Sequence, residues 1–187
     1  MKNFKILALA LVTFVSFTAC SDDDTPAPTN EEEVITTITA TFTPAAGGAP
    51  VVLTSRDLDG DGPNAPVKTV SGNFAAGVAY TGNVTFLNEL ASPADNITDE
   101  IHEEATDHQI FFQQSGLGNF TYGDTDANGQ PIGLNFNYTA APAATSGNLT
   151  ITLRHLPNKS GANVANGDIT NAGGGTDAEV TFAVVVE

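Results

Sequence analysis

Cysteine, tryptophan and basic residues are nearly absent from this chain. It has one cysteine, no tryptophan, and six lysines and arginines against 22 aspartates and glutamates, for a formal net charge of −16. A single cysteine excludes a disulfide within the chain. The excess negative charge would repel nucleic acid, which is therefore not expected as a partner, and would attract divalent cations.

A hydrophobic run long enough to span a bilayer is also missing. The longest apolar stretch, Ile6–Phe17, has roughly 12 to 14 residues with its flanks, and a bilayer core needs about 20. Lys2 and Lys5 precede it, and the small residues Thr18 and Ala19 follow it. This order of positive, apolar and small residues is typical of a secretory signal peptide.

The single cysteine stands directly after that leader. The stretch Ser16-Phe17-Thr18-Ala19-Cys20 resembles the end of a bacterial lipoprotein signal peptide, although Phe17 replaces the usual leucine. The resemblance implies that residues 1–19 are removed and that Cys20 is acylated on its sulfur and its new amino group. Two or three acyl chains hold a protein stably on a membrane.

An acidic, Pro-rich segment follows the cysteine. Ser21-Asp22-Asp23-Asp24 resembles the surface-export signal of lipoproteins from the Bacteroidetes group, which implies the outer membrane and its outer face. The alternative is a solvated acidic linker on a lipoprotein that faces the periplasm. Residues 20–33 lack apolar side chains to bury, so we expect a disordered tether. Without Lys2 and Lys5, four basic residues would remain against 22 acidic ones.

Residues 34–187 alternate between apolar and polar side chains in many short segments. Alternation with a period of two indicates strands that are buried on one face. The clearest segments are 34–42, 80–86, 132–138, 149–153 and 178–186, and further strands are expected at 51–55, 67–74 and 109–113. Pairs such as Asn128-Gly129 and Ser146-Gly147 separate them and favour tight turns.

One-sided strands pair antiparallel, and seven to nine of them in about 154 residues favour two packed sheets. We therefore predict an all-β, antiparallel two-sheet β-sandwich of immunoglobulin-like type, with a closed barrel as the alternative. One segment differs from this pattern. Ser92-Pro93 predicts a helix start, and Ile97, Ile101 and Ala105 recur at intervals of four, which indicates a short acidic helix.

Two loops between predicted strands fit the first half of a calcium-binding motif. Their candidate ligands are Asp57, Asp59 and Asp61 in the first loop, and Asp124, Asp126 and Asn128 in the second. Alternate side chains in a tight loop converge on one point, and the glycine after them lets the chain turn. The sequence therefore predicts Ca²⁺ as a candidate cofactor.

The second half of an EF-hand is missing from both loops. The twelfth positions are Lys68 and Asn135, and neither supplies the bidentate glutamate. The loops resemble the looser DxDxDG loops of β-rich extracellular proteins, in which the remaining ligands come from backbone carbonyls or neighbouring loops. The alternative is that both are simply turns, because Asp, Asn and Gly are the ordinary turn residues.

The three histidines do not form a recognisable zinc motif. His102 begins His-Glu-Glu-Ala-Thr, so the second histidine of an H-E-x-x-H helix is replaced by Thr106. His102 and His108 are six residues apart, so they would not lie on the same face of a helix. The sequence therefore favours ordinary polar or strand-end histidines, with His155 among them, over a transition-metal site.

These observations predict a membrane-anchored lipoprotein with a β-sandwich binding or structural module. The loop Arg56-Asp57-Leu58-Asp59-Gly60-Asp61-Gly62 is similar to loops in small surface lipoproteins of flavobacterial type. No catalytic motif is present, so we expect no enzyme. An unknown protein or glycan is the expected partner, and the alternatives are a glycan-binding or adhesion module and an extracytoplasmic hydrolase.

Overall fold

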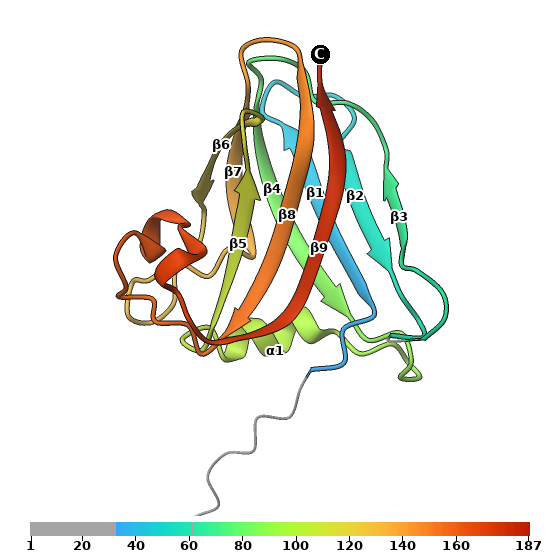
Figure 1. Cartoon of the computed structure of the whole chain (residues 1–187), viewed down its shortest axis with the longest axis vertical. Helices are drawn as coiled ribbons and strands as arrows, with labels where there is room; N and C mark the ends of the chain where they lie inside the picture. Colours follow the sequence, from blue (N-terminus) through green and yellow to red (C-terminus); the bar gives the residue numbers. More distant parts are fainter. Residues whose placement is uncertain (1–32, 61) are drawn as a thin grey trace, which may run out of the picture. The chain divides into compact units, whose positions relative to one another are not determined.

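The computed structural model describes residues 33–60 and 62–187 (Figure 1). The predictions of a leader over 1–19, a lipidated Cys20 and an acidic tether therefore concern residues outside this part, with Glu33 as the exception. Asp61 of the first candidate calcium loop lies outside it as well. Among the described residues, no helix has the length and apolar character needed to cross a membrane.

The described part folds mainly as strands, joined by one short α-helix and two short 3₁₀ helices. In chain order the elements are β1 (Thr37–Pro44), β2 (Val51–Arg56), β3 (Val67–Val70), β4 (Ala79–Leu87), α1 (Ile97–Glu103), β5 (His108–Gln114), β6 (Gly118–Tyr122), β7 (Asn135–Ala140), β8 (Thr145–His155), η1 (Val164–Asn166), η2 (Ile169–Asn171) and β9 (Gly175–Val186).

The strands form two antiparallel sheets that pack face to face. One sheet has the order β3-β2-β1-β4-β7-β6 and the other the order β5-β8-β9. Every ladder within them is antiparallel. The predicted class, an all-β antiparallel sandwich with one short helix, is confirmed.

The core follows the alternation seen in the sequence. Ile38, Ala40 and Phe42 point inward from β1, because successive side chains of a strand face opposite sides. Phe42 is fully buried and makes edge-to-face contacts with the rings of Phe74 and Phe136, at centroid distances of 4.9 and 5.0 Å. The opposite sheet supplies Leu149, Ile151, Leu153, Val180, Phe182, Val184 and Val186.

The predicted helix start is wrong. The helix begins at Ile97 after Asn96, and Ser92 and Pro93 lie in the loop before it. Asn88 and Asp95 exchange backbone hydrogen bonds of 3.0 and 2.9 Å, so the chain between them is closed into a turn and is not helical. The predicted apolar stripe is present, since Ile97 and Ile101 are buried against the core.

The strand predictions also differ from the structure in several places, and the predicted segment 132–138 forms a strand only from Asn135. The predicted strand over 67–74 ends at Val70, and Phe74 instead bridges to Val186 of the other sheet. Strand β6 was not predicted, because its five residues carry only two large apolar side chains, Phe120 and Tyr122.

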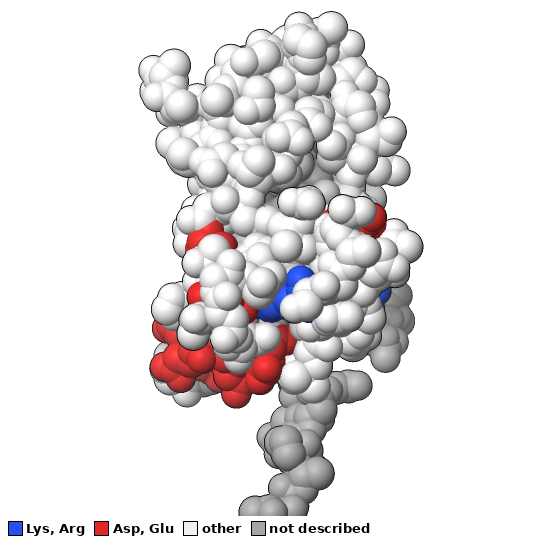
Figure 2. Space-filling view, turned by 90° about the vertical axis from the view of Figure 1, so that its left-hand side faces the viewer, with Lys and Arg blue, Asp and Glu red and all other residues white. Residues whose placement is uncertain are grey.

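The two ends of the sandwich differ in charge. Because neighbouring strands run in opposite directions, successive connections alternate between the ends (Figure 1). The connections at the C-terminal end of β1 (45–50, 71–78, 115–117 and 141–144) carry no charged side chain. The end that α1 crosses carries most of the acidic residues. Figure 2 shows acidic side chains gathered at the lower end of the molecule. The described chain begins at this acidic end.

Candidate metal centre

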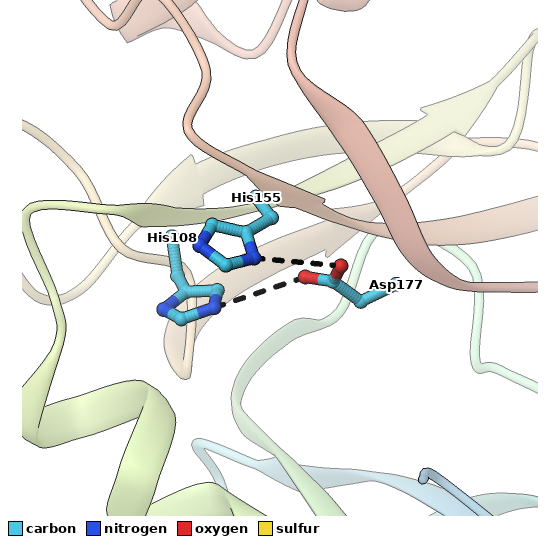
Figure 3. A group of neighbouring side chains, drawn as sticks. All are labelled: His108, His155 and Asp177. Atoms are coloured by element: carbon cyan, nitrogen blue, oxygen red, sulfur yellow. Dashed lines mark ion pairs between the residues drawn. The ribbon is translucent and has the colours of Figure 1, made fainter. Parts of the chain in front are cut away.

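A cluster of histidines and carboxylates lies at the acidic end, where β5 begins and β8 ends. His108 and His155 are register partners in the β5–β8 ladder, and their ring centroids are 4.7 Å apart. Asp177 comes from the next strand, β9, and its carboxylate faces both rings (Figure 3). The three side chains thus come from three adjacent strands of one sheet.

A β-bulge places Asp177 in this position. In the β8–β9 ladder Leu153 pairs with Ala178 and Arg154 pairs with Thr176, so Asp177 is the extra residue of the bulged strand. A bulge turns a side chain away from the strict alternation of a strand. Asp177 therefore joins the histidines although its neighbour Ala178 belongs to the core-facing series.

Glu33 completes the cluster from the segment that precedes β1. Its Oε1 lies 3.4 Å from Nε2 of His108, and Oδ2 of Asp177 lies 3.7 Å from the same nitrogen. Nδ1 of His155 is 3.7 Å from Oδ1 of Asp177. Each of the two imidazoles thus lies within 3.7 Å of a carboxylate oxygen.

All four side chains are withdrawn from water. The exposed fractions are 0 % for His108, 15 % for His155, 5 % for Asp177 and 6 % for Glu33. Oε2 of Glu33, Nε2 of His108 and Nδ1 of His155 are buried and make no hydrogen bond in the described structure. Such atoms are costly in a folded protein unless another group or an ion interacts with them.

The orientation of His108 is set by its other ring nitrogen. Nδ1 lies 3.1 Å from the backbone oxygen of Glu104, which can only accept a hydrogen bond. Nδ1 therefore carries the proton, and Nε2 points at the carboxylates of Glu33 and Asp177. Metal-binding histidines are commonly held in this way by a backbone carbonyl.

Two buried carboxylates need positive charge beside them, from a proton on a histidine or from a bound cation. Burial alone would lower the pKa of His108, but its contacts with Glu33, the Glu104 carbonyl and Asp177 together raise the pKa above the ordinary value of 6.5. The residues that could hold a metal form two overlapping groups, His108 with His155 and Asp177, and His108 with Glu33 and Glu104. The ligand atoms of each group lie within 4.8 Å of one another.

The first predicted calcium loop is a turn whose described carboxylates accept local hydrogen bonds. Oδ1 of Asp57 accepts from the backbone N–H groups of Asp59 and Gly60, at 3.2 and 3.0 Å. Oδ2 of Asp59 accepts from the side-chain amide of Asn64 at 2.6 Å, and this hydrogen bond is the main reason that the pKa of Asp59 is lowered. Calcium binding by this loop stays a prediction.

In the second predicted loop the two carboxylates have separate partners. Asp124 accepts hydrogen bonds of 2.7 Å from the backbone N–H groups of Gly133 and Asn135. Asp126 is buried and forms an ion pair with Lys159, at 2.9 Å between Oδ2 and Nζ. The backbone N–H of Asn128, whose residue is exposed, donates to Asp126 at 2.8 Å. A cation bound to Asp126 would have to displace Lys159.

Sequence reasoning missed the histidine cluster but had a signal for part of it. His108 directly precedes the predicted strand 109–113. His155 follows the predicted strand 149–153, and only Arg154 lies between them. If those two strands pair antiparallel, their outer ends meet, and so do the two histidines. Asp177 and Glu33 had no such signal, because a bulge and a contact across 75 residues decide their positions.

Fold and site together define an antiparallel β-sandwich with a buried histidine–carboxylate cluster at its acidic end. Comparisons with models of known protein families, with curated proteins and with solved structures found no match.

Proposed function

We propose that this protein is an exported, lipid-anchored β-sandwich module that binds a divalent metal cation at the end of the sandwich where its tether joins. The observation that carries the proposal is the set of three buried ligand atoms without hydrogen bonds, on Glu33, His108 and His155. Glu33 and Asp177 both contact Nε2 of His108, at 3.4 and 3.7 Å, and Asp177 also contacts Nδ1 of His155 at 3.7 Å. A cation there would neutralise the carboxylates and be bound by these ligand atoms.

The charge distribution supports this assignment. Helix α1, which carries Asp99, Glu100 and Glu103, crosses the end of the molecule where β5 begins and β8 ends (Figure 1), and acidic side chains gather at that end (Figure 2). Like-signed charges on one surface raise the local concentration of counter-ions of the opposite sign. Divalent cations outside the cell would therefore be concentrated around the proposed site.

The lipid anchor is the second part of the proposal. The proposed anchor depends on the leader of residues 1–19 and on Cys20. The orientation of the domain on the membrane depends on the position of Glu33. Because Glu33 lies at the acidic end, the tether would leave from that end. The uncharged connections at the other end would then point away from the membrane, toward an unknown protein or glycan partner, on the cell surface or in the periplasm.

A holding role fits the burial better than catalysis does. A catalytic metal keeps one coordination position open to water or substrate, whereas a structural metal is enclosed by protein ligands. Here the most exposed of the four side chains, that of His155, is only 15 % exposed. We therefore propose a non-enzymatic module.

The test uses the chain from residue 20 onward, with Cys20→Ser so that it stays soluble. Metal content is measured after incubation with Zn²⁺, Ca²⁺ or Mg²⁺, and thermal unfolding is followed with and without a chelator. We expect one metal per chain and a raised melting temperature, since binding to the folded state adds about 2.7 kcal/mol at a hundredfold excess over Kd.

Two variants locate the bound metal. His155→Gln removes one ligand and should abolish the stabilisation, whereas His102→Gln changes an exposed histidine of α1 outside both ligand groups and should not. Equal losses in both variants, or no bound metal in the parent chain, would contradict the proposal. The same Ca²⁺ titration tests the predicted calcium loop, whose binding would be lost in Asp57→Ala combined with Asp59→Ala.

A further inference from the structure

We infer that the cation is a zinc-class transition metal, and that Glu33 closes its coordination shell and so ties the start of the folded domain to β5, β8 and β9. This inference rests on the proposed function, because it specifies the cation and the ligands of the same centre. It assigns Glu33 a role in metal binding although the sequence pattern places this residue at the end of a tether.

The donor atoms select the class of metal. Ca²⁺ and Mg²⁺ are bound by oxygen atoms, whereas imidazole nitrogens suit zinc and its neighbours in the transition series. The cluster offers one nitrogen each from His108 and His155, and oxygen atoms from Asp177 and Glu33. A set of two imidazoles and two carboxylates has the composition of a four-coordinate zinc site.

Three distances between neighbouring ligand atoms are close to those around a bound zinc ion. Zinc lies about 2.0–2.2 Å from nitrogen and oxygen ligands, so neighbouring ligand atoms of a tetrahedral site are roughly 3.3–3.5 Å apart. The observed separations are 3.4 Å between Glu33 and His108, 3.7 Å between His108 and Asp177, and 3.7 Å between His155 and Asp177. His108, His155 and Asp177 form one group of possible ligands and Glu33 joins His108 in the other, so Glu33 would move toward the first group to become the fourth ligand.

His108 is already oriented as a ligand. Its Nδ1 is held at 3.1 Å by the Glu104 carbonyl, so in the neutral ring Nε2 has a lone pair directed at the centre of the cluster. This arrangement also connects the site to the end of α1, since Glu104 is the C-cap residue of that helix. The metal would therefore meet a ring that needs no reorientation.

Glu33 is placed to close the shell on the side of the chain entry. Its carboxylate is 6 % exposed, although the next residue, Val34, is 51 % exposed. The chain joins the sheet only at Thr36, whose backbone N–H donates to Leu87 at 2.9 Å. The contact between Glu33 and His108 thus lies three residues before the point where the chain joins the sheet.

Metal binding should therefore change the mobility of the segment before β1. With the metal bound, Glu33 would be fixed to three strands of the opposite sheet. Without the metal, residues 33–35 would be released and the tether would begin closer to β1. The centre would set the length and direction of the link between the anchor and the domain.

The test compares the parent chain, again from residue 20 with Cys20→Ser, with Glu33→Gln and with the control Glu103→Gln. Glu103 is an exposed carboxylate of α1 outside both ligand groups. Zn²⁺ affinity is measured by competition with a chromophoric chelator, and the absorption of bound Co²⁺ reports the number of ligands. Hydrogen exchange of residues 33–35 is measured by mass spectrometry with and without Zn²⁺.

We expect Glu33→Gln to weaken Zn²⁺ binding by at least the roughly 10- to 100-fold that loss of an outer-shell partner costs. It should also change the Co²⁺ spectrum and abolish the Zn²⁺-dependent protection of residues 33–35, while Glu103→Gln does none of these. Millimolar Ca²⁺ should not displace the bound Zn²⁺.

The outcomes separate this inference from the proposed function. Zn²⁺ binding that is equally tight in the parent chain and in Glu33→Gln would overturn the role of Glu33 and leave the metal centre intact. Displacement of Zn²⁺ by an equal concentration of Ca²⁺ would overturn the assigned class of metal. No metal in the parent chain would overturn both proposals, and the cluster would then be an ion-pair network around a protonated His108.

Discussion

Lys159→Met tests whether the buried ion pair with Asp126 holds the long loop between β8 and β9 in place. The Lys159 ammonium donates to Oδ2 of Asp126 at 2.9 Å and to the backbone oxygen of Ala105 at 2.6 Å. The two side chains are only 6 % and 1 % exposed. Methionine keeps the length of the side chain and removes its charge and its donors.

The size of the effect follows from what remains around the carboxylate. Removing one partner of a buried ion pair costs about 3–5 kcal/mol, because the other charge stays buried. Asp126 would keep two hydrogen bonds, from the backbone N–H groups of Asn128 and Gln130 at 2.8 and 2.9 Å. We therefore expect Lys159→Met to lower the free energy of unfolding by about 3 kcal/mol, the lower end of that range. This corresponds to a melting temperature lowered by roughly 6–12 °C for a domain of this size.

Urea unfolding of Lys159→Met, Asp126→Asn and the double variant measures the coupling between the two side chains. Lys68→Met is the matched control, since Lys68 is exposed and should change stability by less than about 0.5 kcal/mol. Strictly additive effects of the two single variants, or a loss below about 1 kcal/mol for Lys159→Met, would refute the assignment of the pair as a stabilising contact.

The same variant has a predicted pH dependence. Burial alone would raise the pKa of Asp126, but the hydrogen bonds from Lys159 and from the backbone hold it below its ordinary value of 3.8. A lowered folded-state pKa stabilises the protein above the unfolded-state value, and this contribution is lost as the pH falls below 3.8 toward the folded-state pKa. Lys159→Met removes part of the lowering, so its acid unfolding should begin at a higher pH.

Three further predictions concern the core and the surface. Phe42→Ala should destabilise the domain by about 3–5 kcal/mol in urea unfolding, because a fully buried ring is lost, whereas the exposed Val67→Ala should cost less than about 0.5 kcal/mol. Equal effects of these two substitutions would contradict the described core. Gly82→Ala should lower the melting temperature, since a Cβ there would overlap the Phe136 ring and lie 2.8 Å from the Thr41 oxygen; an unchanged melt would argue against this packing. The hydrogen bond from Arg56, with a second from Thr37, lowers the pKa of Glu89 to about 2. The contribution of Glu89 to stability should therefore be present above the ordinary pKa of 4.5 and be lost as the pH falls toward 2. Carboxyl NMR titration of Arg56→Gln should show a Glu89 pKa closer to 4.5.

Much of the fold was accessible from the sequence because burial on one face imposes a period of two. The segments 34–42, 149–153 and 178–186 were predicted as strands that are buried on one face, and the burial of β1, β8 and β9 follows the same alternation. The start of α1 was not accessible. Ser92 and Pro93 have the local chemistry of a helix start, but the backbone pairing between Asn88 and Asp95 keeps them in a turn.

Most of the candidate site, in contrast to the strands, could not be predicted from the sequence. The aspartate loops were visible as motifs because their candidate ligands are close together in the sequence, and the structure gives Asp126 a partner, Lys159, that lies 33 residues away. The histidine cluster was invisible as a motif, since Glu33, His108, His155 and Asp177 come from four separate segments. Only the pairing of β5 with β8 could have been anticipated, from two histidines at the outer ends of two predicted strands.

The sequence by itself determined the acidic character of the chain and the alternation that makes strands, and it predicted the lipoprotein-like leader, because each of these depends on composition or on neighbours along the chain. The tertiary structure alone decided which charged groups meet. A strand register brought His108 to His155, a bulge turned Asp177 toward them, and the entry of the chain brought Glu33 to the same place. Contacts of this kind depend on how strands pair across long separations, and no local pattern of residues encodes them.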